Sequence, residues 1–359
     1  MTEVNNSIYD TIIIGAGQAG LSAGYFLKKL GKEFIILTKD SRIGNNWRKR
    51  WDSLRLFTPV YYNTLPGMDF PSNDPDYLPD KNETADFLEK YALKYNLPVC
   101  LNTEVVELEG GEHSFTIQTK SGSYFARNVI VATGSFQNPH IPDFAGAISE
   151  SIFQIHSSRY LNPGQLREGD VLVVGAGSSG LQIAAEIAEQ KDSERCVWLS
   201  GPDTGTFPRQ ILGIDIYHFF ALTVFHVPIK SLPGRIIKSV SYRHGDLALR
   251  PTYRKMIKAG VIRVGRTIGL KNGLPLLENN ISLNVKNIIW CTGFRYNFDW
   301  IKLDIFDSKG LPLHNRGIIN KLPGIYFLGL HFQYTISSSL LGGVKKDAEY
   351  IADYIADNT

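Results

Sequence analysis

Short apolar runs separated by longer stretches of mixed polarity dominate the chain. Four of them, Ile12–Ile14, Phe34–Leu37, Val129–Val131 and Val171–Val174, contain no polar residue, which is typical of strands buried on both faces of a parallel sheet. Between the first two runs the pattern predicts a helix that ends near Leu30. Because a strand, a helix and a second strand make a β-α-β unit, we expect an α/β fold.

The remaining pattern predicts further elements. Residues Asn82–Tyr95 have helical periodicity, His113–Thr119 and Ser123–Asn128 are expected to form a hairpin, and Ser337–Ala356 is expected to form the closing helix. The stretch Ile211–Ile229 is long and apolar, but its charged and titratable residues argue against a membrane span. Two interpretations stay open for it: a buried helical excursion, or an apolar lid or wall of a substrate channel.

Two of the apolar runs lead into glycines at GxGxxG spacing. The glycines are Gly15, Gly17 and Gly20 in the first loop, and Gly175, Gly177 and Gly180 in the second. In this motif the first glycine allows a tight turn, the second lets a pyrophosphate approach the backbone, and the third lets the next helix pack closely. One copy is weak evidence, since glycines also serve ordinary turns. Two copies predict two bound dinucleotides, each at a helix N-terminus.

Composition and charge narrow the function classes. With 359 residues, 43% hydrophobic and 20% charged, the chain is long enough for two globular domains. Its 38 basic residues nearly balance its 35 acidic ones, so we expect no nucleic-acid partner. Residues 1–6 lack the apolar core of a secretory signal, and Cys100, Cys196 and Cys291 form no CxxC pair and no metal-ligand spacing. We therefore expect a cytoplasmic protein with no transmembrane segment, no redox-active dithiol and no metal site.

Five motifs occur in an order that resembles the class B flavin-containing monooxygenases and their short bacterial relatives, among them flavoproteins assigned to cation transport. The motifs are the first glycine loop, Gly44-Asn45-Asn46-Trp47, Ala132-Thr133-Gly134, the second glycine loop and Trp290-Cys291-Thr292-Gly293-Phe294. The resemblance extends from residue 9 to about residue 350. The family's FxGxxxHxxxY fingerprint is half present, because His156 and Tyr160 fit while Phe144 lies six residues too early.

The resemblance implies two Rossmann-like dinucleotide-binding domains, the NAD(P)-binding domain being inserted into the FAD-binding domain. Residues 1–150 and 287–359 would form the FAD domain, and residues 151–286 the NAD(P)H domain. The first loop would hold FAD, with Gln18 and Ala19 among its contacts.

The second loop would hold NADPH, with Ser178 and Ser179 among its contacts and Ser200 at the end of the next strand. Pro202 stands where NADP-specific members commonly carry an arginine. Arg209 is one residue that could supply the missing charge, and NADH remains open as the coenzyme.

Further FAD contacts are implied along the first domain. Trp47 and Arg48 would lie near the isoalloxazine ring, with Leu54 to Thr58 lining the flavin pocket. The other implied contacts are Val105, Val106, Thr133, Gly134, Thr292, Gly293, Gly329 and Gln333. A core strand would explain Val105 and Val106 equally well.

The ribose end of the FAD site departs from the usual pattern. At the end of the second strand an acidic residue is expected to bind the adenosine ribose, but Thr38 takes that place, followed by Lys39 and Asp40. Thr38 could donate one hydrogen bond and Asp40 could reach the ribose. Alternatively, Asp40 only caps a turn.

The resemblance implies an NAD(P)H-dependent FAD monooxygenase that forms a C4a-(hydro)peroxyflavin from O2. Its small-molecule substrate would be a sulfide, an amine or a ketone. Asn63 stands where some relatives place an asparagine that stabilises the oxygenated flavin, although a turn residue is the alternative. Two other functions stay open: an NAD(P)H oxidase or flavin reductase that releases hydrogen peroxide, and a non-enzymatic flavoprotein partner of an ion-transport system. A homodimer is compatible with either enzyme.

Overall fold

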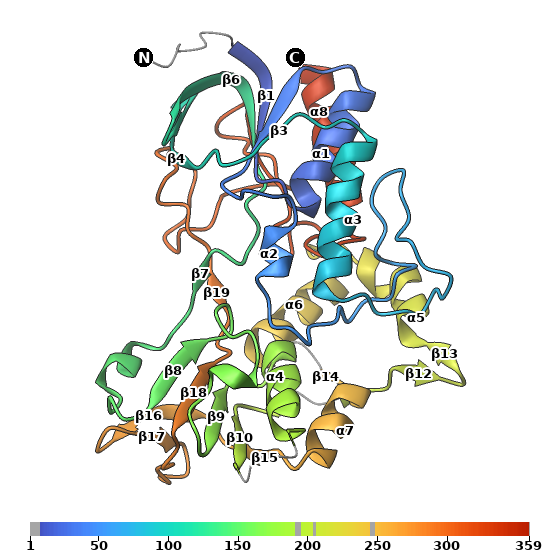
Figure 1. Ribbon diagram of the computed structural model, residues 1–359. Helices are drawn as coiled ribbons and strands as arrows, with labels where there is room; N and C mark the ends of the chain where they lie inside the picture. Colours follow the sequence, from blue (N-terminus) through green and yellow to red (C-terminus); the bar gives the residue numbers. More distant parts are fainter. Residues whose placement is uncertain (1–7, 191–194, 204–205, 245–247, 359) are drawn as a thin grey trace.

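The computed structural model describes residues 8–190, 195–203, 206–244 and 248–358 (Figure 1). Two sheets, each covered by helices, lie one above the other and are joined by thin connecting segments, and both chain ends lie at the far end of the first sheet (Figure 1). The expected α/β fold with two Rossmann-like units is confirmed. No helix of the described residues is long and apolar enough to cross a membrane.

The first sheet has seven strands in the order β3-β2-β1-β6-β5-β4, with β20 paired to β6. The strands are β1 (Ile8–Ile14), β2 (Phe34–Leu37), β3 (Val99–Cys100), β4 (Val105–Gly111), β5 (Ser114–Thr119), β6 (Gly122–Val131) and β20 (Ile325–Phe327). β1, β2, β3, β6 and β20 pair in parallel, whereas β4, β5 and β6 form an antiparallel meander. The expected hairpin is therefore present, and its second arm continues into the strand that leads to residue 131.

Helices cover one face of the parallel strands of the first sheet. The residues on the opposite face pack with side chains of the meander strands β4 and β5. Ile13 and Ile36 pack towards α1 (Gln18–Lys29), α3 (Lys81–Lys94) and α8 (Lys345–Asn358), while Ile12 and Ile14 pack towards the meander. Successive residues of a strand point to opposite faces, so an unbroken apolar run is what a sheet covered on both sides requires. Each such side chain contributes about 1.5–3 kcal/mol on full burial.

The second sheet contains five parallel strands in the order β15-β10-β9-β18-β8. The strands are β8 (Phe153–His156), β9 (Val171–Val174), β10 (Val197–Ser200), β15 (Ile262–Val264) and β18 (Asn287–Trp290). One face is covered by α4 (Ser178–Ala188) and α7 (Arg250–Lys258), and the other by a 3-10 helix at Asp143–Ala147 and the hairpin of β16 (Thr267–Lys271) and β17 (Leu274–Leu277).

The connections between the two sheets lie at different residues from those expected. Residues 287–290, placed in the returning part of the first domain, form β18 in the middle of the second sheet. Ala145, placed in the first domain, packs in the core of the second. The chain crosses at β7 (Asn138–Pro139) and β19 (Phe294–Arg295), which pair with each other. Glycine motifs alone do not locate such crossings, because they mark the strand ends and not the sheet to which a strand belongs.

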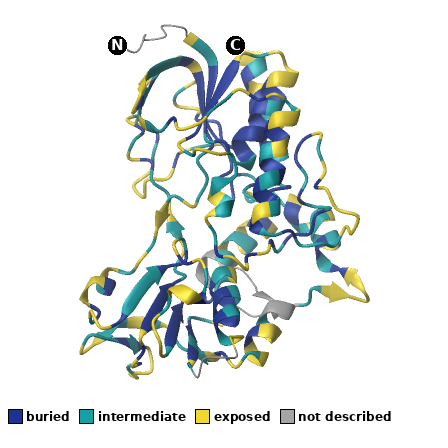
Figure 2. Ribbon diagram, in the orientation of Figure 1, coloured by how far each residue is buried: buried dark blue, intermediate teal, exposed yellow. Residues whose placement is uncertain are grey.

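The stretch Ile211–Ile229 is not a buried helix. It contains a small hairpin of β12 (Gln210–Ile211) and β13 (Ile214–Asp215), helix α5 (Ile216–Leu222) and a 3-10 turn at Val224–His226, followed by α6 (Leu232–His244). Leu212 is 97% exposed and Leu222 80% exposed, whereas Tyr217 and Phe225 are buried. Figure 2 shows the hairpin projecting from the molecule as an exposed arm.

The closing helix begins at Lys345, eight residues later than the periodicity predicts. Ser338 accepts hydrogen bonds from the backbone N–H groups of Tyr334 and Thr335, and Ser337 donates to the carbonyl of Phe225 (2.8 Å). Serine side chains that bond nearby backbone compete with helix formation, so this segment is a series of turns. The remaining short elements are α2 (Asn45–Arg48) and a two-stranded pair of β11 (Thr206–Phe207) with β14 (Ala248–Leu249).

Candidate functional site

The first glycine loop connects β1 to α1, and two of its glycines are forced by contacts inside the protein. A Cβ atom on Gly15 would lie 2.4 Å from the carbonyl oxygen of Ala132, and Gly15 has φ +115°. A Cβ on Gly20 would lie 1.8 Å from the carbonyl oxygen of Gly15. Any larger residue at either position would push the loop away from its neighbours, so these glycines hold the turn and the helix together.

Gly17 has no such internal reason to be glycine. Its φ of −85° suits any residue, and a Cβ placed on it would meet no protein atom within 4 Å. Gly17 is also the N-cap of α1, where no side chain caps the helix and no acidic residue occupies the first turn. The open position and the unused N–H groups fit an anion that approaches the backbone closely, as a dinucleotide pyrophosphate does.

The second glycine loop, between β9 and α4, repeats this arrangement. A Cβ on Gly175 would lie 2.2 Å from the carbonyl oxygen of Cys291, and one on Gly180 would lie 1.8 Å from that of Gly175. Gly177 has φ −76° and open space, and α4 has neither a side-chain cap nor an acidic first turn. Ser178 is the first residue of α4, followed by Ser179. Both loops thus combine a fixed backbone with one open glycine.

Two matching tripeptides support the two loops. Ala132-Thr133-Gly134 follows β6 and presses on the first loop, and Cys291-Thr292-Gly293 follows β18 and presses on the second. Gly134 has φ +73° and Gly293 has φ +83°, so both turn where most residues would be strained. Each tripeptide leads towards a crossing strand. Thr133 accepts a hydrogen bond from Gln137 (2.7 Å), and Thr292 donates one to the carbonyl of His140.

His156 is a buried, hydrogen-bonded residue beside this crossing and is not an exposed general acid or base. Its Nε2 bonds the carbonyl of Gly293 at 3.1 Å and its Nδ1 lies 3.0 Å from the hydroxyl of Ser158. The side chain is buried, and burial lowers its pKa in spite of the bond to Gly293. His156 therefore fixes the passage between the sheets.

Thr38 stands at the position where the ribose of a dinucleotide on the first loop is expected. It lies at the end of β2, is buried, and its hydroxyl is the acceptor for the backbone N–H of Asp40 at 3.4 Å. The carboxylate of Asp40 pairs with Lys49 on the surface at 3.3 Å, while Lys39 is exposed. These contacts are those of a turn cap, and ribose contacts by Thr38 and Asp40 stay predictions.

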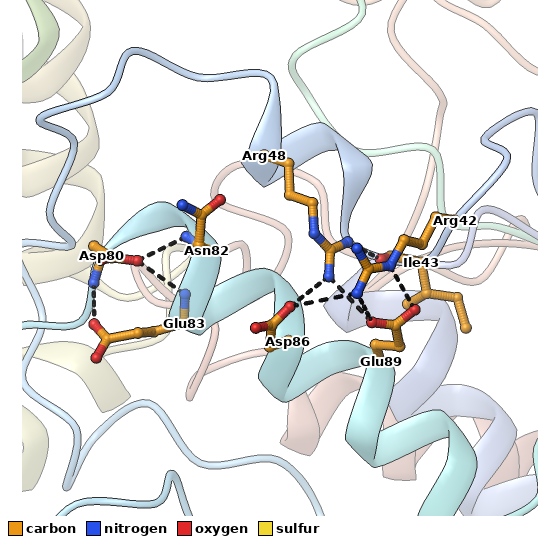
Figure 3. A network of polar contacts seen from close by, with 8 residues as sticks. All are labelled: Arg42, Ile43, Arg48, Asp80, Asn82, Glu83, Asp86 and Glu89. Carbon is orange, nitrogen blue, oxygen red and sulfur yellow. Dashed lines mark hydrogen bonds and ion pairs between the residues drawn. The ribbon is translucent and has the colours of Figure 1, made fainter.

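Arg48 has partners on α3. Its guanidinium donates to Asp86 at 2.6 Å, to Glu89 at 3.2 Å and to the carbonyl of Ile43, and Arg42 shares Glu89 (Figure 3). The same view shows how α3 begins: Asp80 accepts from the N–H groups of the first turn, and Glu83 accepts from the N–H of Asp80. Such a capping box stabilises a helix start by about 1 kcal/mol.

The residues beside Arg48 connect the two domains. Trp47 packs against the cores of both sheets, and Leu54 is buried in the core of the second sheet together with α4. Trp47, Arg48 and Leu54, which were predicted to contact the flavin, thus all have partners within the protein. Their contact with the isoalloxazine ring stays a prediction.

Asn63 is fully buried, and both the oxygen and the nitrogen of its side-chain amide form hydrogen bonds with Thr58. The Thr58 hydroxyl donates to Oδ1 at 2.6 Å, and Nδ2 donates to the Thr58 carbonyl at 2.7 Å. The amide therefore holds a turn in this structure. These bonds use one of the two N–H groups of Nδ2 and one lone pair of Oδ1, so the predicted catalytic contact with flavin stays a prediction that rests on the second N–H.

The other implied FAD contacts lie on three segments. Val105 and Val106 are on β4, half-buried and exposed respectively. Gly329 follows β20 with φ +82°, and a Cβ on it would meet Ala19 at 3.0 Å, so this segment lies against the first loop. Gln333 is buried and accepts from the N–H of Leu330 at 3.2 Å.

Two side chains that were implied to contact NADPH form hydrogen bonds with other groups of the protein. Ser200 is fully buried, and its hydroxyl donates to the carbonyl of Gly265 and accepts from the N–H of Thr267. Arg209 donates to Asp215 at 2.5 Å and to the carbonyl of Phe57 at 2.6 Å, so its guanidinium fastens the exposed arm to the first domain. A phosphate contact by Arg209 would have to displace these bonds.

Arg263 is the residue that motif reasoning did not single out. It lies on β15 beside β10, and its guanidinium donates to the carbonyls of Gly201 (3.2 Å) and Pro202 (2.9 Å). It therefore places a positive charge at the end of β10, where NADP-specific relatives carry an arginine in the loop. Arg263 is the last of eight arginines and lysines between residues 235 and 263, and spacing along the sequence cannot show which of them reaches the loop.

Arg50 is a second such residue. Its guanidinium lies 4.8 Å from the ring centroid of Phe136 and 5.3 Å from that of Phe294, at the crossing between the sheets. Burial lowers its pKa to about 10, and no ion pair joins it to a carboxylate of the described residues. Arg50 therefore places a positive charge at the crossing between the two sheets.

Comparison with known proteins agrees with this arrangement. A model of the pyridine nucleotide-disulphide oxidoreductase family matches residues 12–202. The chain is 43% identical to a CzcO-like oxidoreductase of Geobacillus kaustophilus over 98% of this chain and 99% of that protein. It is 40% identical to the oxidoreductase CzcO of Bacillus subtilis over 96% and 98% of the two chains.

A solved flavin monooxygenase from Stenotrophomonas maltophilia, carrying two substitutions, has the same fold with a TM-score of 0.79. The two sequences are 25% identical, and the aligned region covers 98% of this chain and 99% of the monooxygenase chain. Disulphide chemistry is part of the matched family's description, but the three cysteines of this chain are free and far apart in sequence. The chain belongs to the pyridine nucleotide-disulphide oxidoreductase family and, within it, to the class B flavin monooxygenases, the flavin-dependent oxidoreductases that its glycine loops and their order indicated.

Proposed function

We propose that the chain is an NAD(P)H-dependent FAD monooxygenase, with FAD at the first glycine loop and NADPH at the second. The observation that carries this proposal is the contrast within each loop. The outer glycines are required by backbone contacts, whereas Gly17 and Gly177 face open space. A glycine with no internal cause at the N-cap of an uncapped helix fits the close approach of a pyrophosphate.

The chain's own groups bind and orient the two dinucleotides. The N–H groups at the start of α1 and α4 face the pyrophosphates, and the helix dipoles favour the negative charge there. When bound, the flavin would supply the redox chemistry: it would accept a hydride from the nicotinamide coenzyme and activate dioxygen for transfer of one oxygen atom to a sulfide, an amine or a ketone. The protein aligns the two rings and excludes water from them.

We favour NADPH over NADH because of Arg263. Its guanidinium lies at the carbonyls of Gly201 and Pro202, where the adenosine ribose of a dinucleotide on the second loop would end. A planar guanidinium binds a phosphate through two hydrogen bonds, which suits the 2′-phosphate that distinguishes NADPH.

The test is stopped-flow spectroscopy of the FAD-loaded protein. The enzyme is reduced with NADPH under anaerobic conditions and then mixed with oxygen. We expect a C4a-adduct spectrum that persists for seconds and decays faster when a thioether such as thioanisole is added, with sulfoxide as the product. Direct return to oxidised flavin with stoichiometric hydrogen peroxide would contradict the monooxygenase assignment.

That contrary result defines the second candidate function, an NAD(P)H oxidase that releases hydrogen peroxide. One observation favours it: the amide of Asn63 is occupied by Thr58 and is fully buried. If the second N–H of this buried amide does not reach the flavin, the oxygenated flavin would be less protected and would eliminate hydrogen peroxide. The measured ratio of sulfoxide to peroxide separates the two candidates.

A further inference from the structure

A cavity of about 280 Å³ lies between the loop that contains Asn63, the segment formed by α5 and the 3-10 turn at Val224–His226, and the start of α8. Its lining includes Tyr61, Tyr62, Ala221, His226, Lys345 and Lys346. Ala221 and His226 belong to the stretch Ile211–Ile229, so the inner side of this stretch is a cavity wall while its outer side is exposed.

The two lysines of the cavity contact a hydroxyl and an imidazole, and neither of these partners is a carboxylate. Lys345 donates to the hydroxyl of Thr64 at 3.1 Å, and Lys346 lies 3.3 Å from Nδ1 of His226. Burial, together with the positive charges of Lys346 and Lys345, lowers the pKa of the His226 ring and so disfavours its charged form. Among the described residues, no carboxylate forms an ion pair with either lysine.

The one carboxylate of the lining is already neutralised. Asp347 is 2% exposed and accepts from Nε of Arg316 at 3.0 Å. Lys345 and Lys346 therefore give the cavity a net charge that nothing in its lining balances. They are also the first two residues of α8, where the helix dipole disfavours cations by about 0.3–1 kcal/mol each. An anion bound in the cavity would offset this cost.

The walls of the cavity are aromatic and their backbone is tightly packed. Tyr62 packs on Phe225, with ring centroids 4.9 Å apart. A Cβ on Gly342 would lie 1.7 Å from the carbonyl oxygen of Tyr62, and one on Gly343 would lie 1.9 Å from that of Ser337. The cavity is thus preformed by backbone contacts, which favours a flat apolar body beside the charged end.

The cavity connects to the first glycine loop through one segment. This segment lies against Ala19 at Gly329 and accepts a hydrogen bond from Gln18 at the carbonyl of Ser339 (3.4 Å) before it reaches Gly342. A molecule in the cavity would therefore lie beside the segment that borders the proposed FAD site.

We propose that this cavity binds a small aromatic carboxylate, with the carboxylate at Lys345 and Lys346 and the ring against the tyrosines. The inference deepens the proposed function by naming a substrate class, and it rests on that function for the oxygenation but not for the binding. The binding step can be measured without any turnover.

The test uses phenylacetate and its neutral analogue phenylacetamide as probes of the FAD-loaded protein, with binding measured by isothermal titration calorimetry. We expect phenylacetate to bind at least about tenfold tighter than the amide, since a charge-assisted hydrogen bond is roughly twice as strong as a neutral one. The double variant Lys345→Gln, Lys346→Gln should lose this preference and leave the weak binding of the amide unchanged. Lys309→Gln, which changes an exposed lysine far along the chain, is the matched control and should behave as the parent protein.

Equal affinities for the two probes, no saturable binding of phenylacetate, or full retention of the preference in the double variant would overturn the inference. Flavin content and NADPH oxidation without added carboxylate are measured in the same preparations. Loss of NADPH oxidation with intact carboxylate preference would count against the proposed function alone, and the reverse result would count against the cavity alone.

Discussion

The two glycine loops have nearly the same internal geometry and differ in what lies beyond the next strand. In each loop the outer glycines are pressed against backbone, the middle glycine is open, and a tripeptide after a neighbouring strand supports the turn. Beyond β2, however, lies Thr38 with a capped turn, whereas beyond β10 lies Arg263 with its guanidinium at the strand end. We propose that the loop provides a pyrophosphate site in both cases and that the residues at the ribose end determine which dinucleotide each loop suits.

The largest effect is expected at Gly17. We predict that Gly17→Val abolishes FAD retention, because the added side chain would occupy the space that the pyrophosphate needs. The fold should survive, since the position has ordinary φ and no protein atom within 4 Å of a Cβ. Flavin content after purification, with circular dichroism as the check on folding, measures this. A Gly17→Val protein purified yellow and fully flavinated would break the assignment of the first loop.

Gly20→Ala gives the opposite behaviour and sharpens the contrast within the loop. The added Cβ would lie 1.8 Å from the carbonyl oxygen of Gly15. We therefore expect the apoprotein to melt at a lower temperature and the purified variant to contain less flavin. Unchanged melting of the flavin-free protein would show that the outer glycine is not required by packing.

Gly177→Val should separate the two loops. We expect this variant to keep FAD and to lose reduction by NADPH, with KM for NADPH raised at least about 100-fold, an effect of roughly 2.7 kcal/mol. Anaerobic reduction by dithionite should remain normal, because it does not need the second loop. If Gly177→Val instead purified without flavin, the two cofactors would have been assigned to the wrong loops.

Arg263→Gln tests the ribose end of the second loop. Loss of a charge-assisted contact worth about 1.5–3 kcal/mol should raise KM for NADPH about 10- to 100-fold and leave KM for NADH nearly unchanged. Lys271→Gln, an exposed cation on the β16–β17 hairpin, is the control. Equal losses with both coenzymes would indicate that Arg263 only supports the loop at Gly201 and Pro202.

The smallest effect is expected at Thr38. Removal of one neutral hydrogen bond worth about 0.5–1.5 kcal/mol should weaken FAD binding only about 2- to 13-fold in Thr38→Ala. Equilibrium dialysis of the reconstituted apoprotein measures the change, and Asp40→Asn reports whether the carboxylate takes part. A loss as large as that of Gly17→Val would mean that Thr38 replaces the missing acid fully.

The sequence predicts the fold well where a pattern is local. Unbroken apolar runs placed β1, β2 and β9, and the glycine spacing placed both loops. It does less well where long-range packing decides. The start of α8 moved to Lys345 because serine hydroxyls and two tightly packed glycines hold the preceding turns, and β18 joined a sheet that no local signal identifies.

The site shows the same limit. Gly17 and Gly177 could be found from spacing, but Arg263 acts from a neighbouring strand some 60 residues beyond the loop that it touches, and spacing within a motif cannot reveal such a residue. Arg48 and Arg209, both chosen by position along the chain, are bound to carboxylates on other segments. The motifs therefore predict where the phosphates bind, and tertiary contacts decide which other side chains lie near these loops.

A crystal structure of the chain with FAD and NADP⁺ tests the central claim most directly. The account predicts the FAD pyrophosphate at the N–H groups beside Gly17, the NADP⁺ pyrophosphate at those beside Gly177, and the 2′-phosphate at the guanidinium of Arg263. Density for FAD over the second loop, or a 2′-phosphate held by other residues while Arg263 stays at the carbonyls of Gly201 and Pro202, would contradict it.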